Sequence, residues 1–289
     1  SKGIPRHWRR LRQAQPERWD ESVKDFARHF LLALQFFTRI PVTGRLAEWV
    51  GFSPAMLRAS AAHFPGVGWI VGGLTAGVMW GLLVLLPPVP AAPWVAAIAS
   101  TVFGVLLTGA FHEDGLADLA DGLGGSMDRS RALEIMKDSR IGSFGAIALV
   151  LAVLAKVAVL ALLAQTNAWL AVVALFAAHV TSRTAPLLVI RSLPHVGDTP
   201  QSKSKPLAES IGNAGLAVGL LWWALAMALV VWLLPAAPWA QAVLGALVGL
   251  AWMWRLLQRR LQGFTGDGLG ATQQVSEVLF CLGLALSVA

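Results

Sequence analysis

Seven long apolar stretches constrain this chain more than any other feature of its sequence. A transmembrane helix needs about 20 predominantly apolar residues, and turn signals such as the prolines between positions 87 and 93 separate the stretches. Hydrophobic residues make up 56% of the chain and charged residues 13%, a balance far from that of a soluble domain. The sequence therefore predicts an all-α, polytopic integral membrane protein with about seven transmembrane helices. The stretches run approximately over 66–86, 93–111, 141–164, 167–190, 212–234, 237–256 and 268–288.

Lysine and arginine are distributed unevenly over the polar breaks between these stretches. Eleven precede the first stretch, four lie in 112–140, three in 191–211 and three in 255–260, whereas the alternate breaks and the C-terminus contain none. Such residues accumulate on the cytoplasmic side of membrane proteins. We therefore expect a cytoplasmic N-terminus and a C-terminus on the opposite side. The net charge of +7 follows from loops that face anionic lipid, and nucleic acid is not expected as a partner.

The N-terminal part of the chain contains no apolar stretch that is long enough to cross a bilayer. The first 29 residues are basic and polar. Residues 30–40 form a short apolar run, which suits an interfacial or re-entrant helix. We expect residues 1–22 to be a basic polar extension and residues 23–289 to form a single transmembrane catalytic domain with a cytoplasm-facing site.

An acidic segment between the second and third apolar stretches is the strongest candidate for chemistry. It holds seven of the sixteen carboxylates of the chain. If its first half is helical, Asp114, Asp118 and Asp121 lie on one stripe of the helix. Carboxylates suit Mg²⁺, Mn²⁺ or Ca²⁺, and Mg²⁺ commonly joins a few carboxylates to substrate phosphates. The pattern favours a metal site over its alternative, a solvated acidic helix end.

Basic residues follow the aspartates in the same segment. A metal site alone does not need them, whereas an anionic substrate carried with the metal does. We favour Lys137, Asp138 and Arg140 as functional residues, with anchoring of the loop at lipid headgroups as the alternative. Gly115 and Gly122 directly follow two of the aspartates, where a small residue would let a phosphate approach the backbone.

Two further polar groups flank the predicted cytoplasmic edge of the membrane. The cluster GFTGDGLGATQQ begins the last apolar stretch, and among its glycines it places Thr265, Asp267, Gln273 and Gln274. This pattern suits contact with an anion or a sugar, although glycine and threonine also pack transmembrane helices. His63 and His112 are the histidines nearest this edge, and either is a candidate general base.

Four ionisable residues fall inside the predicted spans, where a charge is costly and usually functional. They are Lys156, His179, Arg183 and Glu277. We expect these side chains to pair with one another, and both a structural and a catalytic role remain open.

Several motifs resemble those of the cobalamin synthase family, the adenosylcobinamide-GDP ribazoletransferases. The chain contains FHEDGLADLADG, LEIMKDSRIGSFG and TGDGLGATQQ, together with TRIPV at 38–42, HFPGVG at 63–68 and SRTAP at 182–186. These motifs cover residues 36–289 in the expected order. Gln262 stands where a glycine is common in that family.

The resemblance implies a specific reaction and location. A hydroxyl of α-ribazole, or of its 5′-phosphate, attacks the phosphate attached to cobinamide in adenosylcobinamide-GDP, and GMP leaves. The product is adenosylcobalamin or its phosphate. The resemblance also implies a magnesium-dependent phosphotransferase of the bacterial inner membrane, with Mn²⁺ as an alternative metal and with homo-oligomerisation left open.

The family reaction also suggests roles for individual residues. Asp114, Asp118 and Asp121 are assigned as catalytic metal ligands, with Asp138 and Asp267 as weaker candidates. Lys137 and Arg140 are assigned to phosphates. The remaining candidates for substrate binding are Arg39, His63, His112, Arg183, Thr265, Asp267, Gln273 and Glu277.

Two other functions remain open from the sequence. The aspartate spacing is also similar to that of CDP-alcohol phosphotransferases, which make lipids, although their usual arginine and two later aspartates are absent here. An ion or proton transporter would use the intramembrane ionisable residues as a relay. A transporter should, however, spread its polar groups through the bilayer midplane, often in two related halves, and here they crowd one face.

Overall fold

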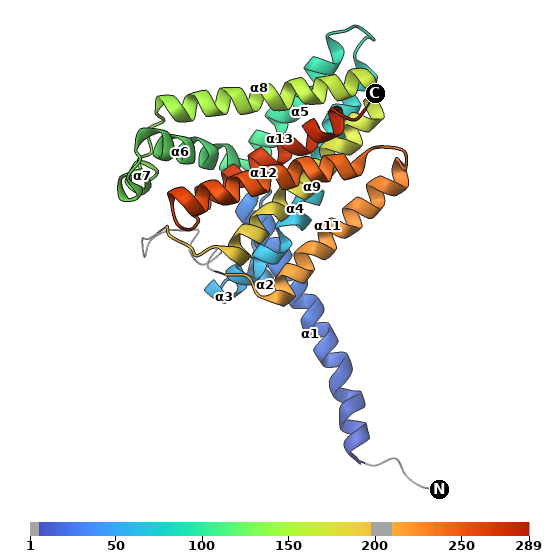
Figure 1. The fold of residues 1–289 in the computed structure, drawn as a ribbon. Coiled ribbons are helices and arrows are strands. Elements are labelled where there is room, and N and C mark those ends of the chain that lie inside the picture. Colours follow the sequence, from blue (N-terminus) through green and yellow to red (C-terminus); the bar gives the residue numbers. More distant parts are fainter. Residues whose placement is uncertain (1–5, 198–209, 289) are drawn as a thin grey trace.

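The computed structural model describes residues 6–197 and 210–288, and these residues form an all-α fold (Figure 1). Within these ranges the only β-type pairing is an isolated bridge between His195 and Phe264. The prediction of an all-α protein is therefore confirmed. The helices are α1 (Arg6–Phe37), α2 (Gly44–Val50), α3 (Pro54–Ser60), the short 3₁₀ helix η1 (Ala61–His63), α4 (Phe64–Leu85), α5 (Ala92–Thr108), α6 (Phe111–Gly125), α7 (Arg129–Ile135), α8 (Ser143–Thr166), α9 (Ala168–Ser192), α11 (Asn213–Leu233), α12 (Trp239–Arg260) and α13 (Gly266–Ala285).

The seven predicted stretches correspond to α4, α5, α8, α9, α11, α12 and α13. In the described part of the chain, five helices are long and apolar enough to cross a membrane by themselves, and six spans result if α5 and α6 count as one broken span. The helix α13 is not among the five. A polytopic membrane protein is confirmed, while the number of seven spans stays a prediction.

The helix α9 is the centre of the bundle. Its most apolar window is 89% buried, compared with 17% to 39% for the other four candidate spans. Glycines bring α4 close to it: a Cβ atom at Gly68 would lie 2.7 Å from the carbonyl oxygen of His179, and one at Gly72 would lie 2.9 Å from that of Phe176. Close backbone approach through small residues is the usual way in which membrane helices associate.

The outer helices expose apolar side chains, as a lipid-facing surface requires. Leu151 and Leu154 of α8 are exposed, and so are Leu221 and Trp232 of α11. Their helices are only 28% and 17% buried over the apolar window. Lipid tails can cover such faces without an unfavourable exposure of apolar surface to water.

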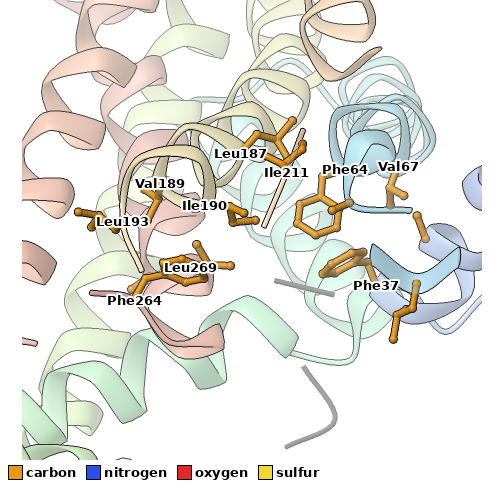
Figure 2. Close-up of a cluster of buried hydrophobic side chains, with 14 of the residues drawn as sticks. Phe37, Phe64, Val67, Leu187, Val189, Ile190, Leu193, Ile211, Phe264 and Leu269 are labelled. Atoms are coloured by element: carbon orange, nitrogen blue, oxygen red, sulfur yellow. The ribbon is translucent and has the colours of Figure 1, made fainter. Parts of the chain in front are cut away.

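The end of α1 joins the core, whereas its start extends away from the bundle (Figure 1). The helix runs without a break through residue 22, where the sequence suggested a boundary. Its last turns bury Leu32, Ala33 and Phe37 in a hydrophobic cluster. Figure 2 shows Phe37 of this cluster beside Phe64. Phe264, just before α13, and Leu269, in its first turn, belong to the same cluster. The apolar run is thus the end of a longer helix, and its interfacial or re-entrant placement stays a prediction.

A sharp bend joins α5 to α6 and directs the acidic segment across the bundle. The two helix axes differ by 88°. Gly109 and Ala110 adopt φ values of 66° and 60°, in the left-handed region that favours glycine. The backbone N–H of Arg39 donates a 2.7 Å hydrogen bond to the carbonyl of Leu107. The helix α6 then packs against α8 and α13.

The loop from α12 to α13 positions the second polar cluster. Gln262 adopts φ 56°, which explains why a glycine suits this position. Phe264 donates to the carbonyl of Pro194 and accepts from the N–H of Val196, both at 2.9 Å. Thr265 then caps α13, because its side chain accepts a 3.1 Å hydrogen bond from the N–H of Gly268. These contacts attach the start of α13 to the end of α9.

Candidate active site

The helix α6 carries the predicted aspartate stripe at three levels of burial. Asp114 is exposed, Asp118 is half-buried and Asp121 is buried. Asp267, at the start of α13, lies against the same helix, because a Cβ atom at Gly115 would be 2.9 Å from the Cα atom of Asp267. The structure thus brings carboxylates from both polar clusters of the sequence to one edge. We call Asp114, Asp118 and Asp267 the carboxylate edge.

The electrostatics of Asp118 reflect this crowding. Burial, followed in order of importance by the charges of Asp267, Asp114 and Asp121, raises the pKa of its carboxyl to about 7. Like charges that disfavour one another are relieved by a bound cation. The carboxylate edge is therefore suited to attract a positive ligand.

The donor set of the carboxylate edge fits an open Mg²⁺ site. Within the described ranges, no three Asp, Glu, His or Cys side chains already converge into a cage for a metal ion. Mg²⁺ usually takes one or two carboxylates and keeps its remaining positions for water and substrate phosphates. Asp114 and Asp118 on α6, together with Asp267 at the adjacent start of α13, could supply these few carboxylates.

The two glycines of α6 do not leave room for a ligand. At Gly115 the space is taken by the backbone of Asp267, and at Gly122 a Cβ atom would lie 2.9 Å from the carbonyl oxygen of Ala132 and 3.1 Å from the sulfur of Met136. The expectation that a phosphate approaches the backbone here is wrong. Both glycines instead let neighbouring helices pack closely.

Asp121 makes contacts that differ from those of the other two aspartates. Its two carboxylate oxygens accept hydrogen bonds from the backbone N–H groups of Gly142 and Gly145, both at 2.7 Å. Asp121 therefore joins the end of α6 to the first turn of α8.

The basic segment after α7 lies beside this junction. Arg140 forms a 2.6 Å ion pair with Asp138, and its hydrogen bonds hold the pKa of that carboxyl at about 2. Lys137 is exposed in the same segment. A groove of about 530 Å³ between α6, α7 and the start of α8 is lined by Asp138 and Arg140, and also by Asp121 and Arg131. Of the two predicted phosphate-binding residues, Arg140 thus borders a groove that opens to solvent, and Glu134 lines the same groove.

The ionisable residues inside the spans form one buried cluster around Glu277. Lys156 makes an ion pair with Glu277, and His179 and Arg183 approach its carboxylate to 3.2 Å and 4.0 Å. Ser182 donates to the same carboxylate at 3.3 Å, and Gln273 also donates to it. The prediction that these residues pair with one another is confirmed. We call them the Glu277 cluster.

A line of amides links the Glu277 cluster to α6. Gln274 donates hydrogen bonds to Gln273 at 3.0 Å and to Glu113 at 2.9 Å. This line of hydrogen bonds therefore ends at Glu113, one residue before Asp114 of the carboxylate edge. Sequence reasoning missed Glu113 and Ser182, although each adjoins a residue that it selected.

The remaining predicted residues lie at different places in the bundle. His112, Arg183 and Gln273 line a small cavity with walls of phenylalanine, and the Nε atom of Arg183 has no hydrogen-bond partner within the described residues. His63 instead lines a separate cavity between α1 and α3 and accepts a 3.3 Å hydrogen bond from Trp222. The structure therefore does not bring the two histidines to one site.

Arg39 lies at the bend between α5 and α6. Its guanidinium covers Gly109, where a Cβ atom would lie 2.8 Å from one of its terminal nitrogens. The side chain remains exposed. Arg39 therefore borders the start of α6, while Thr265 serves as the cap of α13.

Together, the fold and the site define a polytopic helical membrane protein that places a carboxylate edge and a basic segment beside a solvent-open groove. The chain belongs to the cobalamin-5-phosphate synthase family, whose family model matches residues 29–285. This finding confirms the family resemblance predicted from the motifs.

Close relatives carry a common name. The adenosylcobinamide-GDP ribazoletransferase of Albidiferax ferrireducens is 60% identical over 280 residues, which cover 92% of this chain and 100% of that protein. The protein of the same name from Polaromonas naphthalenivorans is 57% identical, covering 91% of this chain and 99% of its own. That of Ralstonia nicotianae is 40% identical, covering 89% and 95%. No solved structure matches this chain.

Proposed function

We propose that this protein is an adenosylcobinamide-GDP ribazoletransferase, which assembles the nucleotide loop of cobalamin. It transfers the cobinamide-phosphoryl group of adenosylcobinamide-GDP to α-ribazole or its 5′-phosphate and releases GMP. The observation that carries the proposal is the carboxylate edge at α6, followed by a solvent-open groove lined by Arg131 and Arg140, in a chain that matches its named relatives over nine-tenths of its length.

The reaction forms one bond to phosphorus and breaks another. The hydroxyl oxygen of the ribazole attacks the phosphorus next to cobinamide, the bond between that phosphorus and the bridging oxygen breaks, and GMP leaves with that oxygen. Negative charge then develops on the transferring group and on the leaving phosphate. A bound Mg²⁺, or Mn²⁺ in its place, would supply the neutralising charge.

The protein residues contribute binding and proton transfer in this scheme. Asp114 and Asp118 would hold the cation, with Asp267 beside them. Lys137 and Arg140 bind substrate phosphate. To do so, Arg140 gives up its exposed ion pair with Asp138. A carboxylate of the edge accepts the proton of the attacking hydroxyl.

The side of the membrane follows from charge. The segment that contains α6 and α7 carries four of the basic residues, and positive loops face the cytoplasm. We place the N-terminus and the active site on the cytoplasmic side of the bacterial inner membrane, where nucleotides and Mg²⁺ are present. The lipid bilayer covers the exposed apolar faces of the outer helices.

The test is GMP release by the purified protein in lipid vesicles. The protein is supplied with adenosylcobinamide-GDP and α-ribazole 5′-phosphate, with either Mg²⁺ or EDTA. We expect GMP and an equal amount of corrinoid product with Mg²⁺, and neither with EDTA. Absence of product with Mg²⁺ and with Mn²⁺ would contradict the proposal, and CDP-diacylglycerol with lipid alcohols would be the next substrates to try.

A further inference from the structure

Asp121 occupies a different environment from the aspartates that precede it on α6. Asp114 is exposed and Asp118 is half-buried, whereas Asp121 is only 9% exposed. Its two oxygens are both used by backbone N–H groups, one from Gly142 and one from Gly145, at 2.7 Å each. Residues on the same stripe of one helix thus face different partners.

The first turn of α8 is shaped to receive this carboxylate. A Cβ atom at Gly142 or at Gly145 would collide with the Asp121 carboxylate. One at Gly145 would also lie 2.9 Å from the carbonyl oxygen of Ala117. Because both positions lack a side chain, α8 approaches α6 closely enough for its free N–H groups to reach Asp121. Side-chain oxygens that satisfy such N–H groups stabilise the start of a helix.

A metal ion at Asp121 would compete with these contacts. The first turn of α8 carries partial positive charge, which favours a carboxylate and disfavours a cation beside it. A cation would also have to share oxygens that already accept two short hydrogen bonds. Asp114 and Asp118 do not have this constraint, because they lie farther along α6 from the α8 junction.

The contact of Asp121 also holds the basic segment in place. Gly142 follows Lys137, Asp138 and Arg140 in the chain by only a few residues. Asp121 lines the same groove as Asp138 and Arg140. Loss of the contact would release the C-terminal end of the segment, while its other end would remain attached to α7.

We infer that Asp121 is a positioning residue rather than a metal ligand: its carboxylate fastens the start of α8 to α6 and thereby holds the phosphate-binding segment beside the carboxylate edge. This inference rests on the proposed function for its effect on substrate binding. The contact itself is testable without any turnover.

The experiment compares Asp121→Asn and Gly145→Ala with Asp118→Asn. The first variant removes the charge and one hydrogen-bond acceptor. The second keeps the carboxylate but displaces it from α8. Three quantities are measured in lipid: Mn²⁺ binding by electron paramagnetic resonance, hydrogen-exchange protection of the amides at positions 142 and 145, and the KM values of both substrates.

We expect Asp121→Asn and Gly145→Ala to behave alike. Both should lose amide protection, leave Mn²⁺ affinity within about twofold of wild type, and raise the KM for adenosylcobinamide-GDP by about tenfold, as loss of a supporting contact commonly does. The KM for α-ribazole without its phosphate should not change, which a general loss of structure would not allow. Asp118→Asn should instead weaken Mn²⁺ binding by about tenfold or more with full amide protection.

Two results would overturn the inference. In one, Asp121→Asn weakens Mn²⁺ binding as much as Asp118→Asn while amide protection is retained, which would make Asp121 a ligand. In the other, the amides of Gly142 and Gly145 in the wild-type protein are no better protected than that of Ser143, and this measurement needs no variant to fold. If wild-type protein releases no GMP but the exchange and Mn²⁺ results hold, the proposed function fails and the role of Asp121 stands.

Discussion

Two acidic regions lie near the contact between α6 and α13, and they are surrounded by opposite charges. At the carboxylate edge, burial and the nearby charges of other aspartates raise the pKa of Asp118 to about 7. In the Glu277 cluster, a fully buried carboxylate is enclosed by Lys156, His179 and Arg183. The first region gathers like charges and suits a cation from solution, whereas the second already contains its own counter-charges.

The difference shows that an acidic residue in a membrane protein is understood from its counter-charges rather than from its depth alone. Glu277 is the more deeply buried and lies within the apolar bundle, yet its partners satisfy it. Asp118 is only half-buried, yet its partial burial and its acidic neighbours together make its charge costly. We therefore expect substitutions at the edge to affect chemistry and substitutions in the cluster to affect stability.

The largest effect is expected at the carboxylate edge. Asp118→Asn removes the central charge of the edge, and turnover should fall by about a hundredfold or more, because charge neutralisation by a metal contributes several kcal/mol to catalysis. The thermal unfolding midpoint should not fall, since a crowded carboxylate is not stabilising. GMP release and unfolding are measured on the same preparation, with Glu48→Gln, an exposed acid on α2, as control. Wild-type turnover in Asp118→Asn would remove the basis for the metal assignment.

The opposite outcome is expected in the Glu277 cluster. Glu277→Gln leaves Lys156 and Arg183 buried without their shared counter-charge, which costs about 3–5 kcal/mol in folding free energy. The midpoint of thermal unfolding should fall markedly. The double variant that adds Lys156→Met should recover part of the loss, because one unpaired charge disappears with its partner. An unchanged midpoint in Glu277→Gln would mean that the cluster does not support the fold.

A smaller effect is expected from the packing beside the cluster. Gly68→Ala would place a methyl group 2.7 Å from the carbonyl oxygen of His179, and such overpacking costs about 1–3 kcal/mol. Gly73→Ala is the matched control on the same helix, because no atom lies within 4 Å of a Cβ atom there. Denaturation in detergent compares the two variants. Equal stability would show that α4 can move away from α9 without cost.

The smallest expected effect concerns the loop that carries Asp267. Gln262 adopts φ 56°, so Gln262→Gly should relieve backbone strain and raise stability by about 0.5–1 kcal/mol. Turnover should not change, because no charge is altered. The reverse control is Gly51→Ala, where φ is 65° and ψ is −175°; this region is essentially restricted to glycine, so the variant should lose at least as much. A destabilised Gln262→Gly would mean that the glutamine side chain makes a more important contact than its backbone geometry suggests.

Much of the fold was predictable because its signal is local. The length of each apolar stretch is a property of consecutive residues, and the long helices follow the predicted stretches within a few positions. The count of membrane-crossing helices was less predictable. The bend at Gly109 and Ala110 and the polar residues of α13 leave five or six clear candidates in the described chain, and a hydropathy pattern does not register such a bend.

The candidate site divides in the same way. The helical spacing correctly placed Asp114, Asp118 and Asp121 on one helix, and the cost of burying charge correctly predicted that Lys156, His179 and Arg183 pair with Glu277. No local pattern distinguishes Asp121 from its neighbours, however, because its partners lie about twenty residues later in the chain.

The sequence by itself determined that this protein is a bundle of membrane helices with an acidic helix next to a basic segment, since both properties depend on residues that are neighbours along the chain. The tertiary structure alone decided which carboxylates meet. It places Asp267 against α6 and bonds Asp121 to the start of α8. It also fills the space beside Gly115 and Gly122 with protein atoms. The physical reason is that the environment of a charge is set by what packs around it, and packing joins residues that are distant in the sequence.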